Sequence, residues 1–145
     1  MLRLIKREFE VEVTPEVAWR HLAQIERWPS WAKHIRKVEL TPSGALTSES
    51  SGHFLLKNGI RSTFRVVQLS VGHGWKWVGP FLWLTVHYDH LFEPVGQQRT
   101  RLTWMVDAEG PGVGLVGRLY AVIYNRNLDT AIPNLIREMN TSKAA

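Results

Sequence analysis

The chain has no cysteine, so disulfide bonds, thiolate nucleophiles and thiolate metal sites are all excluded. It also lacks a run of about 18 uninterrupted apolar residues, which a membrane-spanning helix needs. Its first segment, MLRLIKREFEVEV, is broken by charges too often to match the apolar core of a signal peptide. These absences predict a cytoplasmic protein, and a length of 145 residues favours a single domain over residues 1–145.

Excess charge of one sign is also scarce. Eighteen Lys and Arg against thirteen Asp and Glu give a net charge of +5. The only dense basic patch holds Arg27, Lys33, Arg36 and Lys37. Such a patch can contact phosphates, but a solvated helix face explains it equally well, and we expect no nucleic-acid partner. An interaction protein that docks on a large partner through this patch is therefore one functional interpretation, to be weighed against the two given at the end of this section.

Aromatic residues are abundant: seven Trp, five Phe and three Tyr, whose burial brings wide apolar surfaces into a core. Residues 4–13 alternate in polarity and predict a strand. Thr14-Pro15-Glu16 then supplies a side-chain cap, a proline suited to the first helical turn and an acid suited to the helix dipole. This helix should end before Trp28-Pro29-Ser30-Trp31, and a second short helical turn should end near His34.

The rest of the chain predicts several short strands and one long helix. Apolar residues recur at helical spacing over residues 115–139, with Pro133 expected to kink or split the helix and Asn140 onward expected to fray. The links between strands are short and indicate antiparallel hairpins. The predicted strands cover residues 35–40, 52–57, 60–69, 75–78, 84–93 and 99–109.

This order of elements predicts an α+β fold in which a curved antiparallel sheet wraps around the C-terminal helix. Such a sheet, of six to seven strands, covers its concave face with one helix, and space for a cavity remains between them. Two short helices follow the first strand.

The order also resembles a known superfamily at particular residues. Thr14-Pro15-Glu16, residues 25–31 (IERWPSW) and residues 75–81 (WKWVGPF) are similar to the START-like, helix-grip superfamily that includes polyketide cyclases and dehydrases. His90-Leu91-Phe92-Glu93 and Thr100-Arg101-Leu102 extend the similarity over nearly the whole chain. Residues 58–64 (NGIRSTF) and the turn at 79–81 are similar to its coenzyme-Q-binding branch. The resemblance implies the helix-grip fold and an apolar, often aromatic ligand.

Two motifs suggest a cofactor site or a metal site, but neither has the sequence context that such a site requires. Residues 112–117 (GVGLVG) match the G-x-G-x-x-G dinucleotide pattern, but no second parallel strand follows them, so no cofactor is expected. In the predicted strand 84–93, His87 and Asp89 lie on one face and His90 on the other, so they cannot share a metal ion. No metal site is expected.

The same strand parity points Tyr88 and His90 inward, where they could orient a ligand or move a proton, and they are the candidate catalytic residues. Hydrogen bonding within the core explains an inward histidine at least as well. Few other polar residues should face inward: Ser62, Gln68 and Asn127. The predicted ligand-binding residues are Phe54, Phe64, Trp75, Trp77, Tyr88, His90, Phe92, Trp104, Tyr120, Ile123 and Tyr124.

Apolar residues at a turn, Phe81, Leu82 and Trp83, suggest a gate, which also involves Gly79 and Gly112. The ligand could enter there from a membrane surface. The first interpretation is a module that binds a lipid, quinone or polyketide, and the second is a polyketide cyclase or dehydrase. Ligand identity, catalysis, oligomeric state and the rotation of the terminal helix stay open.

Overall fold

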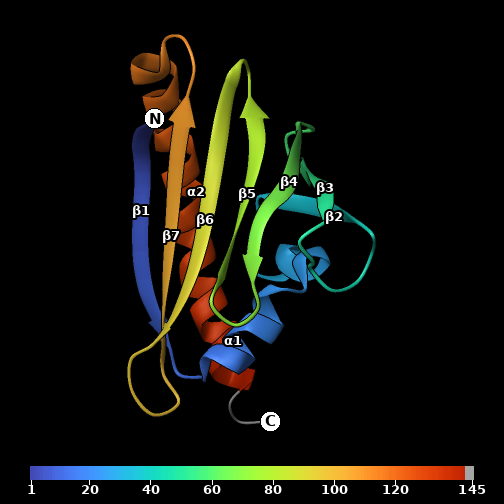
Figure 1. Cartoon of the computed structure of the whole chain (residues 1–145), viewed down its shortest axis with the longest axis vertical. Helices are drawn as coiled ribbons and strands as arrows, with labels where there is room; N and C mark the ends of the chain where they lie inside the picture. The colour runs from blue at the N-terminus through green and yellow to red at the C-terminus, as the bar shows by residue number, and fades with distance from the viewer. Residues whose placement is uncertain (143–145) are drawn as a thin grey trace.

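The computed structural model describes residues 1–142 and shows a seven-stranded antiparallel sheet with two short helices and one long helix (Figure 1). The strand order is β1-β7-β6-β5-β4-β3-β2, so successive strands form hairpins and β1 closes against β7. The helix-grip fold is therefore confirmed. The elements are β1 Leu2–Val11, α1 Pro15–Leu22, η1 Ile25–Ser30, β2 Ile35–Thr41, β3 Ser51–Leu56, β4 Arg61–Ser70, β5 Gly74–Phe81, β6 Leu84–Pro94, β7 Thr100–Glu109 and α2 Val113–Ser142.

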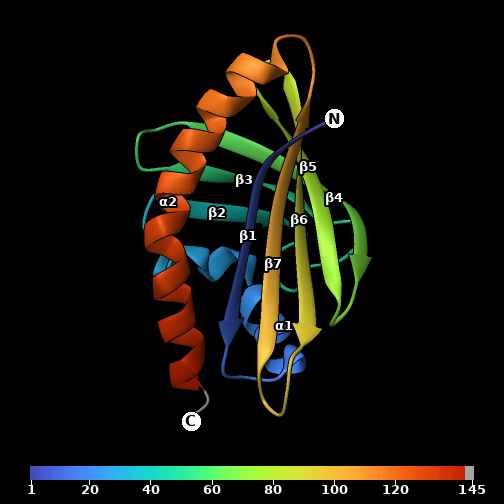
Figure 2. The same ribbon diagram turned by 90° about the vertical axis from the view of Figure 1, so that its left-hand side faces the viewer.

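Helix α2 runs the length of the molecule beside β1, while the sheet bends so that β2 and β3 cross behind it (Figure 2). Its middle is held by β1: Arg7 Nη1 donates to Asp129 Oδ1 at 2.9 Å and to Asn125 Oδ1 at 3.2 Å. Its C-terminal half is held by α1 and η1, where Glu138 accepts from Ser30 Oγ at 2.9 Å and contacts His21 Nε2 at 2.8 Å. The helix is thus anchored at one flank and at its far end.

The first helix begins as its sequence predicts. Val17 N donates to the Thr14 side chain at 3.3 Å, and Pro15 occupies the first turn, where its missing N–H costs nothing. The position expected for the break between the two short helices is wrong. The break lies at residues 23–24, because α1 ends at Leu22 and η1 contains both Trp28 and Pro29. The fixed φ of proline suits this short 3₁₀ helix.

Neither the expected split at Pro133 nor fraying from Asn140 is found in the described part of the terminal helix. Helix α2 runs from Val113 to Ser142 as one element, so Pro133 does not split it, and the helix continues past Asn140. A proline removes one hydrogen bond from a long helix, while the packing of its buried face retains the rest. The expected fraying beyond Ser142 lies outside the described residues.

A bulge in β4 overturns one predicted orientation. The pairing of β4 with β5 shifts between Val66 and Gln68, which inserts one extra residue. A one-residue shift moves every following side chain to the opposite face. Leu69 therefore packs against the core, and Gln68, which strand parity alone points inward, is exposed.

The apolar core lies between the concave face of the sheet and the three helices, and its largest fully buried side chain is Trp75. Within residues 1–142, no helix is long and apolar enough to cross a membrane.

Candidate functional site

Strand β6, which pairs with β5 and β7 inside the sheet, alternates strictly between the two faces of the sheet. Leu84, Val86, Tyr88, His90 and Phe92 are all buried, with at most 9% of their surface exposed. On the opposite face, His87 Nε2 lies 3.3 Å from Glu109 and Asp89 lies 3.9 Å from Lys76. The inward orientation predicted for Tyr88 and His90 is therefore confirmed.

Four tryptophans surround His90 and form what we call the indole cluster: Trp28, Trp75, Trp77 and Trp104. The imidazole stacks on Trp75 with centroids 4.3 Å apart and an interplanar angle of 16°. The centroids of Trp77, Trp104 and Trp28 lie 5.0, 6.0 and 6.1 Å from that of His90. Trp28, Trp75 and Trp77 also contact one another, with centroids 5.4–6.4 Å apart, so the interior at this level is packed rather than open.

Burial determines the charge of His90. Desolvation lowers its pKa to about 3, although a hydrogen bond to the backbone of Trp75 acts in the opposite direction. In that bond Nδ1 donates to Trp75 O at 3.4 Å, which leaves Nε2 as the unprotonated nitrogen. A histidine with so low a pKa is a poor general base near neutral pH, so the contacts of His90 are stacking and hydrogen bonding.

Two indole donors of the cluster have no partner. Trp75 Nε1 and Trp104 Nε1 are enclosed and unpaired, whereas Trp28 Nε1 donates to Leu22 O at 2.9 Å. A buried donor without an acceptor costs about 1–3 kcal/mol. An acceptor beside either nitrogen would therefore stabilise the protein.

A tyrosine cluster made of Tyr88, Tyr120 and Tyr124 lies between β6 and the N-terminal half of α2. The hydroxyls of Tyr88 and Tyr120 are hydrogen-bonded to each other, and the ring of Phe81 packs on Tyr120 at 4.4 Å. The Tyr124 ring lies 5.8 Å from Tyr88 and 5.6 Å from Tyr120. Three predicted ligand-binding residues from two distant segments are thus brought together.

The tyrosine hydroxyls are neutral. Desolvation raises the pKa of Tyr88 to about 12, although its hydrogen bond with Tyr120 acts in the opposite direction. Desolvation is also the main cause that raises the pKa values of Tyr120 and Tyr124. Neutral phenols can donate hydrogen bonds to a ligand carbonyl. Tyr120 and Tyr124 also keep part of their surface exposed, unlike the deeper residues around His90.

Helix α2 presents an apolar strip beside these tyrosines. The strip consists of Leu115, Leu119, Val122 and Ile123, which are 53–80% exposed. Because Asn125 and Asp129 turn the opposite flank of α2 toward β1, Ile123 faces away from β1. Ile123, expected to line an enclosed cavity, is therefore at the surface.

The remaining predicted lining residues divide by depth. Phe64, Trp77 and Phe92 are buried, and the rings of Phe64 and Trp77 contact each other at 4.3 Å, tilted by 37°. Phe54 points to the same interior and contacts Phe64 at 4.9 Å but is only partly buried. Whether these side chains touch a ligand stays a prediction.

The gate residues are arranged differently from the expected turn. Gly79 and Phe81 belong to β5, and a Cβ added at Gly79 would lie 2.1 Å from Thr63 O, so close strand packing requires this glycine. The turn itself is Leu82-Trp83, with Leu82 at a φ of 55°, a strained value for leucine. Trp83 Nε1 donates to Pro111 O at 2.6 Å and ties this turn to the loop that holds Gly112.

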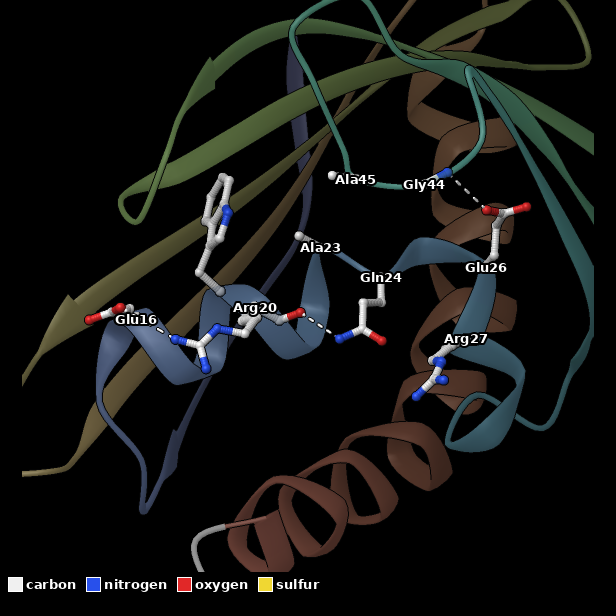
Figure 3. Close-up of a pocket in the computed structure, with 9 residues that line it drawn as sticks. Glu16, Arg20, Ala23, Gln24, Glu26, Arg27, Gly44 and Ala45 are labelled. Atoms are coloured by element: carbon white, nitrogen blue, oxygen red, sulfur yellow. Dashed lines mark hydrogen bonds and ion pairs between the residues drawn. The ribbon is translucent and has the colours of Figure 1, made fainter. Parts of the chain in front are cut away.

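An open cleft of about 500 Å³ lies on the outside of the molecule, between α1, η1 and the β2–β3 loop (Figure 3). Arg20 pairs with Glu16 at 3.3 Å, and Glu26 accepts from Ser43 Oγ at 2.9 Å. Arg27 of the basic patch lines the cleft as well. This hollow is separate from the interior predicted to hold a ligand.

Trp19 separates the outer cleft from the indole cluster and is a residue that sequence reasoning missed. Its ring contacts Trp75 edge-on at 5.4 Å and Phe92 at 5.2 Å, while it also lines the cleft. The signal was present, because Trp19 is adjacent to Ala18 and on the same side of α1 as Leu22.

A family model described as "Polyketide cyclase / dehydrase and lipid transport" matches residues 4–139. The chain belongs to this family. No curated protein sequence matches it significantly. The family and the fold together suggest a ligand-binding cavity.

Solved structures share the fold at low sequence identity. TTHA0849 from Thermus thermophilus has a TM-score of 0.73 at 15% identity and covers 97% of this chain and 99% of its own. XoxI from Bacillus cereus has a TM-score of 0.71 at 14% identity, with 96% of both chains covered. DynU16, from the dynemicin biosynthetic locus, has a TM-score of 0.68 at 16% identity and covers 95% of this chain and 47% of its own.

Proposed function

We propose that this protein binds a hydrophobic small molecule of lipid, quinone or polyketide type between the sheet and helix α2, and that it does so in the cytoplasm. The observation that carries the proposal is the partly exposed end of the tyrosine cluster, formed by Tyr120 and Tyr124, beside the apolar strip of α2. Inward-facing aromatic residues there keep exposed surface that a ligand would bury. Each Å² of apolar area removed from water contributes about 25 cal/mol, which supplies affinity without any charged contact.

The tyrosine end is the point of access in this proposal. Deeper in the molecule the indole cluster is packed, whereas Tyr120, Tyr124 and Phe81 remain partly exposed. The gate consists of the Leu82-Trp83 turn and the loop at Gly112. Breaking the hydrogen bond from Trp83 Nε1 to Pro111 O would let the turn and the loop separate.

The test begins with mass spectrometry of organic extracts of the purified protein. A retained apolar molecule supports the proposal and identifies its chemical class. Leu119→Glu should weaken binding of that molecule, because it places a charge beside the tyrosine cluster. Val71→Glu is the matched control, since Val71 is similarly exposed, at 70%, in the β4–β5 turn. Equal affinity of the two variants would contradict access along α2.

We also propose that the gate end makes transient contact with an anionic membrane surface. Leu82 and Trp83 are 66% and 60% exposed. Lys57 and Arg118 lie on neighbouring segments and make no ion pair within the part of the chain that the structure describes. Exposed apolar side chains with basic neighbours match the chemistry of anionic lipid headgroups.

Vesicle sedimentation tests this contact with phosphatidylglycerol-containing and pure phosphatidylcholine vesicles. The protein should sediment with the anionic vesicles, and Leu82→Gly should reduce that fraction without harming the fold, because glycine tolerates the positive φ at this position. Sedimentation that does not depend on vesicle charge or on Leu82 would refute the contact.

A cyclase or dehydrase activity is the second candidate, and the Tyr88–Tyr120 hydroxyl pair favours it. Neutral phenols that donate to a carbonyl can assist enolisation or loss of water. His90 does not supply the base, because its pKa is lowered to about 3. Turnover of a bound polyketide that is lost in Tyr120→Phe, with binding retained, would establish this function. Unchanged turnover in that variant would remove the pair from the mechanism.

A further inference from the structure

We propose that the indole cluster recognises a neutral oxygen acceptor on the ligand, such as a ketone, quinone or ester oxygen, through Trp75 Nε1 and Trp104 Nε1. The inference rests on the proposed ligand-binding function and specifies the class of ligand. It begins from the two enclosed indole donors that have no hydrogen-bond partner.

Both donors belong to side chains that are almost completely buried. Trp75 is 1% exposed and Trp104 is 6% exposed, so bulk water reaches neither indole nitrogen. The indole nitrogens of Trp28 and Trp83, in contrast, both donate to backbone carbonyls. Buried donors are nearly always paired, and two unpaired ones in a single cluster therefore point to an acceptor that comes from outside the chain.

His90 lies beside both tryptophans. Its ring centroid is 4.3 Å from that of Trp75 and 6.0 Å from that of Trp104. The imidazole stays neutral, and its Nδ1 donates a hydrogen bond to Trp75 O. The region around the two donors is thus polar at particular atoms and apolar everywhere else, as in sites that recognise one oxygen of a largely apolar molecule.

The electrostatics exclude an anionic head group at this depth. Among the described residues, the buried polar side chains are Ser50, His90 and Thr100, and no lysine or arginine is buried with them. A carboxylate would lose its hydration without gaining a counter-ion, which is far more costly than burying a carbonyl. The indole cluster therefore selects a ketone, quinone or ester over a free fatty acid.

The ligand would reach these donors from the tyrosine cluster. Tyr88 and His90 are two residues apart on the same face of β6, so the two clusters are separated by about 7 Å along the strand. Trp75 and Trp104 both pack against His90, so the rings around His90 must move apart by about the diameter of one oxygen atom to admit the acceptor. A ligand that spans both clusters would have its apolar body at α2 and its oxygen at the indoles.

Three small probes with similar ring systems test this inference: 2-methyl-1,4-naphthoquinone, 2-methylnaphthalene and 2-naphthoate. Calorimetric titration gives the affinity ratio of the quinone to the hydrocarbon for the native protein, Trp75→Phe and Trp104→Phe. The absence of cysteine prevents thiol adducts with the quinone. Each substitution should lower the ratio about five- to tenfold, which is the value of one lost hydrogen bond. 2-Naphthoate should bind at least about tenfold more weakly than the quinone, for want of a buried cation.

Trp31→Phe is the matched control, because Trp31 packs on Trp104 at 5.9 Å and its nitrogen is not one of the two enclosed unpaired donors. Hydrocarbon binding by each variant shows that its interior is still folded. A ratio that is unchanged in both variants, or that falls equally in the control, overturns the inference while the proposed function stands. Failure of every probe to bind would instead refute the proposed function itself.

Discussion

Replacing His90 with phenylalanine should remove a pH dependence of stability that its burial creates. The folded protein binds a proton at His90 only below pH about 3, whereas an unfolded chain binds one below the usual 6.5. The unfolded state therefore holds more protons between these values, and stability is complete above pH 6.5 and lost as the pH falls toward 3. The lowered pKa corresponds to about 5 kcal/mol in total, at about 1.36 kcal/mol per pH unit.

The expected loss from His90 alone is about 2 kcal/mol at pH 5 and about 3 kcal/mol at pH 4, relative to pH 7.5. Urea unfolding at these three pH values gives the free energy of unfolding for the native protein and for His90→Phe. The aromatic ring of phenylalanine preserves stacking on Trp75, so both proteins should fold. The difference between their stabilities should shrink or reverse in favour of the variant as the pH falls.

Carboxylates titrate in both proteins and cancel from the comparison. His87→Phe serves as a second reference, since it alters the outer face of the same strand. Because it retains His90, it should lose stability in acid as the native protein does. If the native protein and His90→Phe lost stability in parallel between pH 7.5 and 4, the imidazole would be solvated. The reasoning from burial to a neutral, hydrogen-bonding His90 would then be wrong.

Two other pairs of variants test packing and hydrogen bonding by thermal unfolding. Gly79→Ala should destabilise the protein by about 3 kcal/mol or more, because the added Cβ would lie 2.1 Å from a backbone oxygen of β4. The Cβ of Gly114→Ala meets nothing within 4 Å, so this variant should stabilise the protein by up to about 1 kcal/mol. Equal effects of the two substitutions would contradict the strand packing. Tyr120→Phe should cost about 1–2 kcal/mol by leaving the Tyr88 hydroxyl unpaired. Tyr124→Phe should leave the stability nearly unchanged, since no hydrogen bond of its hydroxyl is found within residues 1–142. A similar loss of stability in Tyr120→Phe and Tyr124→Phe would contradict the hydrogen bond between Tyr88 and Tyr120.

Strand parity predicted much of the interior from the sequence, because side chains alternate on a regular strand. It placed Tyr88 and His90 on the inner face of β6 correctly. It failed at Gln68, where a bulge adds a residue and reverses the faces. A bulge depends on pairing with the neighbouring strand, and a single sequence carries no direct signal for it.

The surroundings of each helix were harder to predict than the helices themselves. The Thr14 cap was clear, because its chemistry is local. The exposure of Ile123 depends on which flank of α2 meets β1, and that flank is selected by Arg7, far away in the sequence. The apolar arc of the helix is too broad to reveal this rotation. Helical spacing places Trp19 on the side of α1 that holds Leu22, but its partners, Trp75 and Phe92, come from strands that follow much later and could not be inferred.

The turn at Leu82 shows a further limit of sequence reasoning. Glycine and proline usually mark turns, so Gly79-Pro80 was the natural choice. The structure uses the glycine for close packing against Thr63 and makes the turn with a leucine in an unfavourable conformation. Long-range strand pairing overrides local preference here, and an exposed leucine remains at the tip.

The most direct test of ligand binding between the sheet and α2 is to locate a bound probe by NMR. Intermolecular nuclear Overhauser effects from 2-methyl-1,4-naphthoquinone should appear at Tyr120 and Tyr124, and at Trp104 if the oxygen reaches the indoles. Contacts confined to Trp19 and Arg20 would instead place the ligand in the outer cleft. That result, or the absence of any contact at saturating probe, would contradict the account.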